Sequence, residues 1–168
     1  IDTENNKMLA KGLCERDGSK DYYIKHGADK DERIFAQYMA DHEEALAVVF
    51  DALCHSERST IHSINEIDAI GHRIVHGGNY FDSSVLITPD VIKKIESLCT
   101  LAPLHNPPAL KCINVCQSMA PDMPQVAVFD TSFFQSLPPS AYMYPLPYEL
   151  CEKHQIRKYG AHGTSHRY

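Results

Sequence analysis

Hydrophobic positions recur along the chain with two different periods, which predict a mixture of helices and strands. Four segments show the three-to-four-residue repeat of an amphipathic helix: 41–55, 88–101, 106–119 and, more briefly, 148–155. Four others are short apolar runs bounded by turn residues, as strands are: 7–13, 21–25, 67–75 and 125–130. The order of these segments predicts an α/β fold in which the strands pair in a mixed sheet.

Residues at the ends of these segments are typical of helix and strand boundaries. Asp41, Thr88 and Asn106 each precede a helical segment and are placed to cap it. The last two are followed by proline, which favours the first position of a helix. Residues 17–19, Asp-Gly-Ser, predict a hairpin turn between the first two strands.

Two glycine-rich segments, 77–78 and 160–166, predict tight turns at the ends of elements. Their glycines would let backbone amides approach a phosphate group, although neither segment matches a P-loop or a dinucleotide-binding fingerprint. In the second segment, Thr164 or Ser165 is placed to cap a following helix.

Composition and charge narrow the class of protein. The chain has 168 residues, 43% hydrophobic, with a formal net charge of −6. This length and apolar content suit one globular domain and exclude a disordered chain, and the acidic charge argues against nucleic acid or an anionic membrane as the main partner. No apolar run reaches the roughly 18–20 residues that span a bilayer, and we expect no signal peptide. Because the chain begins at Ile1 and stops at Tyr168, we expect it to be part of a longer protein.

The six cysteines predict reduced thiols in a cytosolic protein. They are scattered through ordinary sequence with no secretion signal and no Cys-x-x-Cys pair. Cys112 and Cys116 lie four apart on an expected helix, where packing is the favoured role. His72 and His76 are too far apart on a strand for easy joint ligation, so a structural metal module is disfavoured.

Three polar side chains stand where an α/β sheet would gather a ligand. Arg73 lies inside an apolar strand, where a guanidinium is costly unless it meets an anion, either a structural acid or a carboxylate or phosphate ligand. Asp130 ends a buried strand, as a turn carboxylate or as one that orients substrate or magnesium. His162 lies between small residues and is either structural or close to a ligand. The residues alone leave these alternatives open.

Four motifs, 71–78, 101–107, 126–131 and 157–166, together resemble the acetate kinase family, in its order and spacing. That family is part of the acetate and sugar kinase, Hsp70 and actin superfamily. The resemblance implies a ribonuclease H-like mixed sheet flanked by helices. It also implies that residues 1–168 are the N-terminal acyl-substrate domain of a two-domain kinase, whose first strand and C-terminal nucleotide domain lie outside these residues.

The activity implied by the resemblance is direct in-line transfer of a phosphoryl group from ATP to acetate, giving acetyl phosphate and ADP, with these residues inactive alone. The family's roles fall on six positions: catalytic Asp130 and His162, and substrate-binding Arg73, His105, Val75 and Leu104. The resemblance also implies a Mg²⁺ cofactor with most ligands elsewhere, a homodimer formed through the second domain, and a cytoplasmic location without nucleic-acid or membrane partners.

Three positions depart from the family pattern. Phe134 replaces a common histidine and Ser136 a usual threonine, neither at a core catalytic position. Ala161 stands where some members have phenylalanine in the acyl pocket, so a longer acid would fit there. A propionate or other short-chain acid kinase therefore remains an alternative, as does a binding domain without catalysis.

Overall fold

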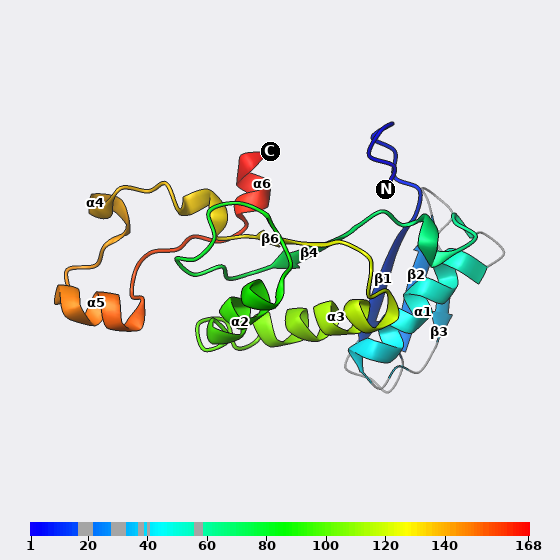
Figure 1. Cartoon of the computed structure of the whole chain (residues 1–168), viewed down its shortest axis with the longest axis horizontal. Helices are drawn as coiled ribbons and strands as arrows, with labels where there is room; N and C mark the ends of the chain where they lie inside the picture. Colours follow the sequence, from blue (N-terminus) through cyan, green and yellow to red (C-terminus); the bar gives the residue numbers. More distant parts are fainter. Residues whose placement is uncertain (17–21, 28–32, 37–38, 40, 56–58) are drawn as a thin grey trace. The chain divides into compact units, whose positions relative to one another are not determined.

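The computed structural model describes residues 1–16, 22–27, 33–36, 39, 41–55 and 59–168. The chain forms two compact units. The first comprises residues 1–67 with 118–120, and the second comprises residues 68–117 with 121–168. Figure 1 gives the order of the elements along the chain.

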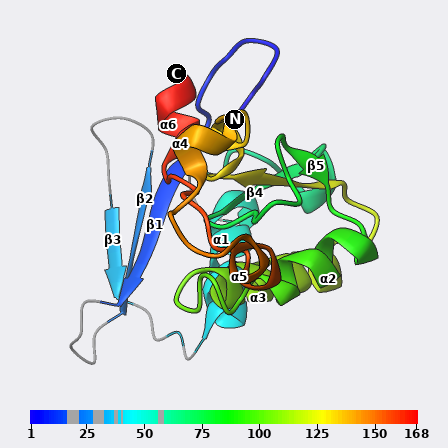
Figure 2. The same ribbon diagram turned by 90° about the vertical axis from the view of Figure 1, so that its left-hand side faces the viewer.

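The first unit holds a small antiparallel sheet. Its strands are β1 (Lys11–Arg16), β2 (Tyr22–Gly27) and β3 (Arg33–Ala36), in that order (Figure 2). The antiparallel pairing of the first two strands is confirmed, but β1 begins four residues later than the expected 7–13, and β3 was not predicted. The expected turn at 17–19 lies outside the described residues.

Helix α1 (His42–His55) follows in the same unit and begins where the sequence predicts. The Asp41 carboxylate accepts hydrogen bonds from the backbone N–H groups of Glu43 at 2.9 Å and Glu44 at 3.1 Å. Asp41 therefore caps the helix, since the side chain of an N-cap residue accepts hydrogen bonds from the first backbone N–H groups of a helix. A 3₁₀ turn, η1 (Ile64–Glu66), is capped in the same way by Ser63.

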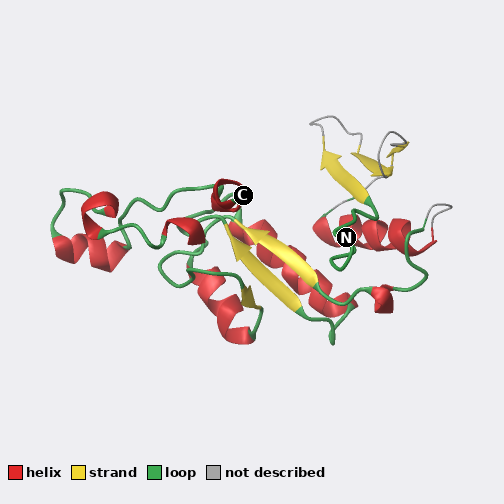
Figure 3. Cartoon of the chain, turned by 90° about the horizontal axis from the view of Figure 1, so that it is seen from above, coloured by secondary structure: helices red, strands yellow, loops and turns green. Residues whose placement is uncertain are grey.

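The second unit is built on a mixed three-stranded sheet. Strand β6 (Gln125–Phe129) lies in the centre, parallel to β4 (Ile70–Ile74) and antiparallel to β5 (Val85–Leu86), as Figure 3 shows for the two longer strands. The predicted α/β class with mixed pairing is confirmed. Strand β4 is shorter than the apolar run at 67–75, and β5 was missed because two residues carry no readable period.

Helix α2 (Pro89–Ser97) and all but the last two residues of helix α3 (Asn106–Met119) belong to the second unit. In α2 the Thr88 hydroxyl accepts from the Val91 amide at 3.3 Å, so the predicted cap is confirmed. The helix ends at Ser97 rather than at 101, because turns follow it, in which the Leu98 amide donates a hydrogen bond to the carbonyl of Ile95, three residues earlier. Helix α3 has the predicted bounds.

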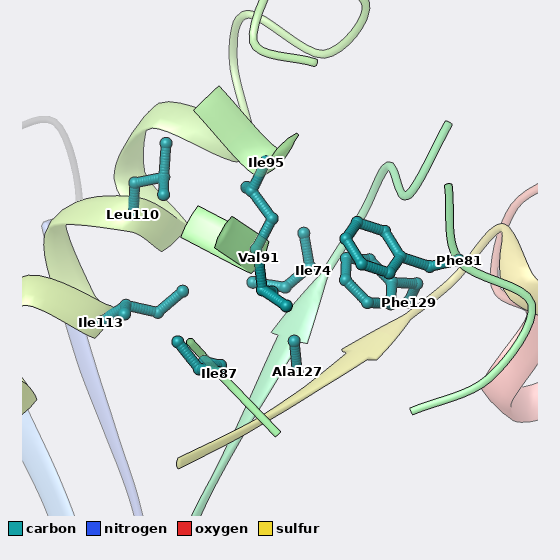
Figure 4. Close-up of a cluster of buried hydrophobic side chains, with 9 residues drawn as sticks. All are labelled: Ile74, Phe81, Ile87, Val91, Ile95, Leu110, Ile113, Ala127 and Phe129. Atoms are coloured by element: carbon teal, nitrogen blue, oxygen red, sulfur yellow. The ribbon is translucent and has the colours of Figure 1, made fainter. Parts of the chain in front are cut away.

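The core of the second unit lies between one face of the sheet and these two helices (Figure 4). It comprises nine buried side chains: Ile74, Phe81, Ile87, Val91, Ile95, Leu110, Ile113, Ala127 and Phe129. The rings of Phe81 and Phe129 are stacked, with centroids 4.2 Å apart. Because side chains alternate along a strand, the residues between the core positions point to the other face.

Short elements follow β6: η2 (Ser132–Phe134), α4 (Pro139–Tyr142), α5 (Tyr148–His154) and α6 (Gly163–Arg167). The predicted short helix at 148–155 is confirmed. The prediction of a turn over 160–166 is wrong for its second half, because residues from Gly163 onward form α6. The N-cap residue of α6 is His162, rather than the predicted Thr164 or Ser165. Within the described part of the chain, no helix has the length and apolar character needed to cross a membrane.

Candidate functional site

Arg73 lies on the face of β4 opposite the core. Its neighbour Ile74 is fully buried, whereas the Arg73 side chain is 58% exposed. Arg73 lies within β4 as predicted, but its guanidinium is not buried there, because the period of two places consecutive side chains on opposite faces. Because the Arg73 guanidinium is exposed to water, it does not need an anionic partner to offset the cost of burial. It nevertheless forms an ion pair.

That anion is the carboxylate of Asp130, the residue directly after β6. Parallel pairing of Arg73 with Val128 brings the carboxyl ends of β4 and β6 to one edge of the sheet. Arg73 Nε donates to Asp130 Oδ1 at 3.1 Å and Oδ2 at 3.2 Å, and Nη2 donates to Oδ2 at 2.6 Å. Only 1% of the Asp130 side chain is exposed, so this fork holds a buried carboxylate against an exposed cation.

The electrostatics of the pair keep both groups charged. Burial by itself would raise the pKa of Asp130, but the hydrogen bonds and charge of Arg73, together with a hydrogen bond from Thr164, hold that pKa below its usual value. In the same way, the hydrogen bonds and charge of Asp130 raise the pKa of Arg73. Asp130 is therefore an ionised acceptor at neutral pH, with no proton to give.

His162 completes the cluster from the other side of Arg73. Its Nδ1 lies 3.0 Å from Arg73 Nη2 and 3.9 Å from Asp130 Oδ2. A guanidinium has no acceptor, so Nδ1 accepts this hydrogen bond and the proton of the neutral ring is on Nε2. The residue has a φ of 53°, in the left-handed region that costs a non-glycine residue energy. The fold thus holds a strained backbone that brings this ring to Arg73.

Gly163 ties the histidine to the strand end. Its amide donates to the backbone carbonyl of Asp130 at 2.9 Å, and a Cβ here would collide with that oxygen and with Phe133. The phosphate-cradle role expected for the glycines is wrong for three of them, because their amides are already bonded within the protein. Gly77 donates to Thr131 and Gly78 to His76.

Replacing Gly163 by alanine is expected to destabilise the second unit by about 1–3 kcal/mol, since the methyl group must displace a backbone carbonyl. Gly71→Ala is the matched control, because a Cβ at Gly71 meets no atom within 4 Å. Urea unfolding of both variants measures the difference. A Gly163→Ala protein as stable as Gly71→Ala would contradict the close approach to Asp130.

Asn106 has a different role from the one its position predicts. Its side chain does not cap α3: Oδ1 accepts from the His76 amide at 3.2 Å, and Nδ2 donates to the His76 carbonyl at 3.0 Å. This fully buried amide braces the turn after β4. Sequence reasoning missed this role, since Asn-Pro before a helix is equally typical of a cap.

Arg157 is a second residue that the sequence did not single out. Its guanidinium donates to Asn79 Oδ1, Gln135 Oε1 and the Phe134 carbonyl at 3.3–3.4 Å, and it lies 4.0 Å from the centre of the Tyr142 ring. It therefore joins the segments that follow β4 and β6 to the segment that leads to His162. Its place in the 157–166 motif was the available signal.

In the described part of the chain, no side-chain hydrogen bond links the remaining predicted site residues to this cluster. Val75, directly after β4, is half-buried, whereas Leu104 and His105, before α3, are exposed, Leu104 by 80%. Within the residues that the structure describes, no hydrogen bond joins the His105 ring to Arg73, Asp130 or His162. The structure thus joins three of the six predicted residues directly.

In the described part of the chain, no group of three His, Cys, Asp or Glu side chains is arranged to hold a metal ion. The six cysteines are free. His72 Nε2 lies 2.8 Å from the Gln125 side-chain oxygen. Both Asp130 oxygens are engaged by Arg73 and Thr164, so this buried carboxylate does not fit a direct Mg²⁺ ligand here.

The whole chain, residues 1–168, matches the model of the Acetokinase family, and it belongs to that family. It is 53% identical over 169 residues to the acetate kinase of Caldanaerobacter subterraneus subsp. tengcongensis and 51% identical over 168 residues to that of Clostridium acetobutylicum. Each alignment covers 100% of this chain and 42% of the relative. The chain therefore spans less than half the length of these relatives.

Solved structures agree with the sequence relatives. The acetate kinase of Porphyromonas gingivalis matches with a TM-score of 0.90 and 43% identity, over 98% of this chain and 41% of that one. A propionate kinase from Francisella tularensis subsp. tularensis SCHU S4 matches with a TM-score of 0.90 and 41% identity, over 100% of this chain and 42% of that one. The resemblance drawn from the four motifs is confirmed.

Proposed function

We propose that residues 1–168 are the acyl-substrate domain of a longer kinase that transfers a phosphoryl group from ATP to acetate. The observation that carries this proposal is the joined cluster of Arg73, Asp130 and His162 at the carboxyl ends of β4 and β6. The products are acetyl phosphate and ADP. The proposal is supported by membership of the Acetokinase family and by relatives named acetate kinase.

The chemistry requires charge stabilisation rather than proton removal. Acetate resembles an aspartate side chain, with a pKa near 4, so it is already ionised and nucleophilic at neutral pH. No general base is needed, which fits an Asp130 whose oxygens are both engaged by Arg73. We assign Asp130 the role of positioning Arg73.

Arg73 supplies the cation for two anions that must approach each other. Its Nε and Nη2 are held by Asp130 and His162, while Nη1 has no hydrogen-bond partner among the described residues. This edge of an exposed guanidinium binds the acetate carboxylate and the transferred phosphoryl group. Such a donor acts most strongly in the transition state, where charge spreads over the equatorial phosphoryl oxygens.

His162 adds a neutral donor. Because Nδ1 accepts from Arg73, Nε2–H is the ring's donor, and it bonds an equatorial oxygen of the transferred phosphoryl group. In the proposed mechanism both donors stabilise the phosphoryl group as it passes from the leaving oxygen of ATP to the attacking oxygen of acetate. The transfer is direct and in line, without a phosphorylated enzyme intermediate. His105 assists at the same group, a role that rests on the family resemblance.

ATP and Mg²⁺ enter this proposal from the family rather than from the described residues. Mg²⁺, when bound, neutralises charge on the phosphates of the nucleotide. Its ligands lie mostly in the part of the kinase beyond these residues, and Asp130 stays a positioning group. The same family resemblance carries the proposals of a homodimer formed through the second domain and of a cytoplasmic location.

Val75, Leu104 and Ala161 are proposed to surround the methyl group of the acid. Leu104 is 80% exposed, so its side chain is accessible to a bound acyl group. The small side chain of Ala161 leaves room for one more methylene. A propionate kinase is therefore the second candidate, supported by the similarity to the Francisella enzyme.

The test is an assay of the full-length protein for acyl phosphate formation, with acetate and propionate compared by kcat/KM. We expect acetyl phosphate from acetate and ATP, and no turnover from residues 1–168 alone. A higher kcat/KM for propionate would assign the second candidate. Binding of acetate by calorimetry without any acyl phosphate would instead establish a non-catalytic binding domain and refute the proposed activity.

A further inference from the structure

Three consecutive residues converge on Asp130. His162 Nδ1 lies 3.9 Å from Oδ2, the Gly163 amide donates to the backbone carbonyl, and the Thr164 hydroxyl donates to Oδ1 at 3.1 Å. The sequence suggested Thr164 as a cap for the last helix. Inside α6, its hydroxyl is directed to the buried carboxylate.

The two oxygens of Asp130 are not equally held by Arg73. Oδ2 receives the short bond from Nη2 at 2.6 Å, whereas Nε is shared almost equally between Oδ1 and Oδ2, at 3.1 and 3.2 Å. Without Thr164, the only donor to Oδ1 in this cluster would be the Nε–H group of Arg73, which Oδ1 shares with Oδ2. A shared donor leaves the carboxylate able to rotate about its Cβ–Cγ bond, which is a soft torsion.

Thr164 removes that freedom. A hydroxyl fixed on α6 gives Oδ1 a donor of its own, so the carboxylate is bonded at both oxygens from two different elements. The same hydrogen bond helps to lower the pKa of Asp130, since it favours the ionised form. Arg73 is in turn aligned by the carboxylate plane, because the guanidinium fork requires the two groups to lie nearly in one plane.

We propose that Thr164 is a positioning residue, which locks the Asp130 carboxylate and thereby sets the direction in which the Nη1 edge of Arg73 meets the substrate. The inference rests on the proposed function and deepens it. Thr164 does not touch the reacting groups: it acts through Asp130 and Arg73. The hydroxyl is the functional part, so serine should replace threonine and valine, which has the same shape, should not.

The kinetic test compares Thr164→Val with Thr164→Ser in the full-length protein. We expect the valine variant to lose about tenfold in kcat with ATP and acetate, as for one hydrogen bond to a charged group, and the serine variant to stay within about threefold of the wild type. A valine variant with wild-type kcat overturns the proposal. So does a serine variant as impaired as the valine variant.

A second readout is independent of activity. Nitrogen-15 NMR of the Arg73 Nε–H group reports how firmly that proton is held, through its rate of exchange with water. We expect exchange to become at least about fivefold faster in Thr164→Val and to stay near wild type in Thr164→Ser, since a mobile carboxylate holds Nε–H less of the time. Unchanged exchange in the valine variant overturns the positioning role.

The two readouts separate the possible failures. If the wild-type protein makes no acyl phosphate, the proposed function fails, while the exchange rates still decide whether Thr164 positions Arg73 through Asp130. If the protein is active and Thr164→Val changes neither kcat nor exchange, the proposed function stands and the inference about Thr164 is refuted. Equal unfolding free energies of the two variants would show that a difference in kcat is not due to unfolding.

Discussion

Arg73→Ala is expected to lower the turnover of the full-length enzyme by about 10²–10³-fold, the effect of removing one preorganised donor to transition-state charge. The loss should appear mainly in kcat, because Asp130 holds the guanidinium in place before substrate arrives, and in the proposed mechanism Arg73 bonds most strongly to the phosphoryl group in the transition state. Initial rates of acyl phosphate formation at varied acetate concentration measure it. Near-normal turnover in this variant would refute the role proposed for Arg73.

Two control variants distinguish the effect of the forked hydrogen bonding of Arg73 from the effect of its positive charge. Arg73→Lys keeps a cation but cannot bind both Asp130 oxygens and His162 at once, so we expect it to recover only part of the activity. Lys94→Ala removes a partly exposed cation that pairs with Asp90 at 2.9 Å on α2, and turnover should be unchanged. A Lys94→Ala variant as slow as Arg73→Ala would show that net charge, rather than the site, controls the rate.

Asp130→Asn is expected to lower turnover by about 10²-fold, since an amide cannot align Arg73 as the carboxylate does. The asparagine keeps the size of the side chain but turns an N–H₂ group toward one of the N–H donors of Arg73. Because the Arg73 side chain is 58% exposed, water screens the pair, and the free energy of unfolding at pH 7 should fall by only about 1–2 kcal/mol. Assay and urea unfolding measure the two effects.

The pH dependence of this stability difference has a definite sign. The pKa of Asp130 is lower in the folded chain than its value of about 3.9 in an unfolded one, so its contribution is fully present above that pH and is lost as the pH falls through the folded pKa. The wild type should therefore exceed Asp130→Asn most clearly at neutral pH, with the gap closing below about pH 4. Asp51→Asn, at a side chain 75% exposed, is the control. A gap that widens in acid would contradict an ionised Asp130.

The magnesium dependence of Asp130→Asn tests the remaining alternative for this carboxylate. If Asp130 only positions Arg73, the variant should need the same Mg²⁺ concentration for half-maximal rate as the wild type. If it orients hydrated magnesium, as the sequence also allowed, that concentration should rise several-fold. Titration of Mg²⁺ at saturating ATP distinguishes the two roles.

Local signals predicted most of the helices and strands of the second unit. Thr88 and Pro89 mark the start of α2, and the apolar run before Asp130 marks β6, because capping and side-chain period act within a few residues. Strand β5 and the short helices α4 and α6 were missed. They are too short to show a period, and the segments around them determine their conformation.

The candidate site was predicted in its members but not in its geometry. Arg73 and Asp130 stood out because each is a charged residue beside apolar strand positions, and His162 because it lies among glycines. Their joining follows from the parallel pairing of β4 with β6 across 57 positions of sequence, which no local pattern specifies. Asn106 and Thr164 were taken as helix caps, since a cap and a long-range hydrogen bond use the same residue types.

The sequence by itself determined the family, the α/β class and the identity of the three charged or titratable groups, because motifs and periods depend on residue type and spacing alone. Only the tertiary structure decided that Arg73 faces away from the core, that His162 accepts through Nδ1, and that Thr164 holds Asp130. These are directions of side chains from separate elements. These directions depend on which strand ends and helix ends pack together. Buried polar groups need hydrogen-bond partners, and here the partners come from segments far apart in the sequence, so no single segment specifies them.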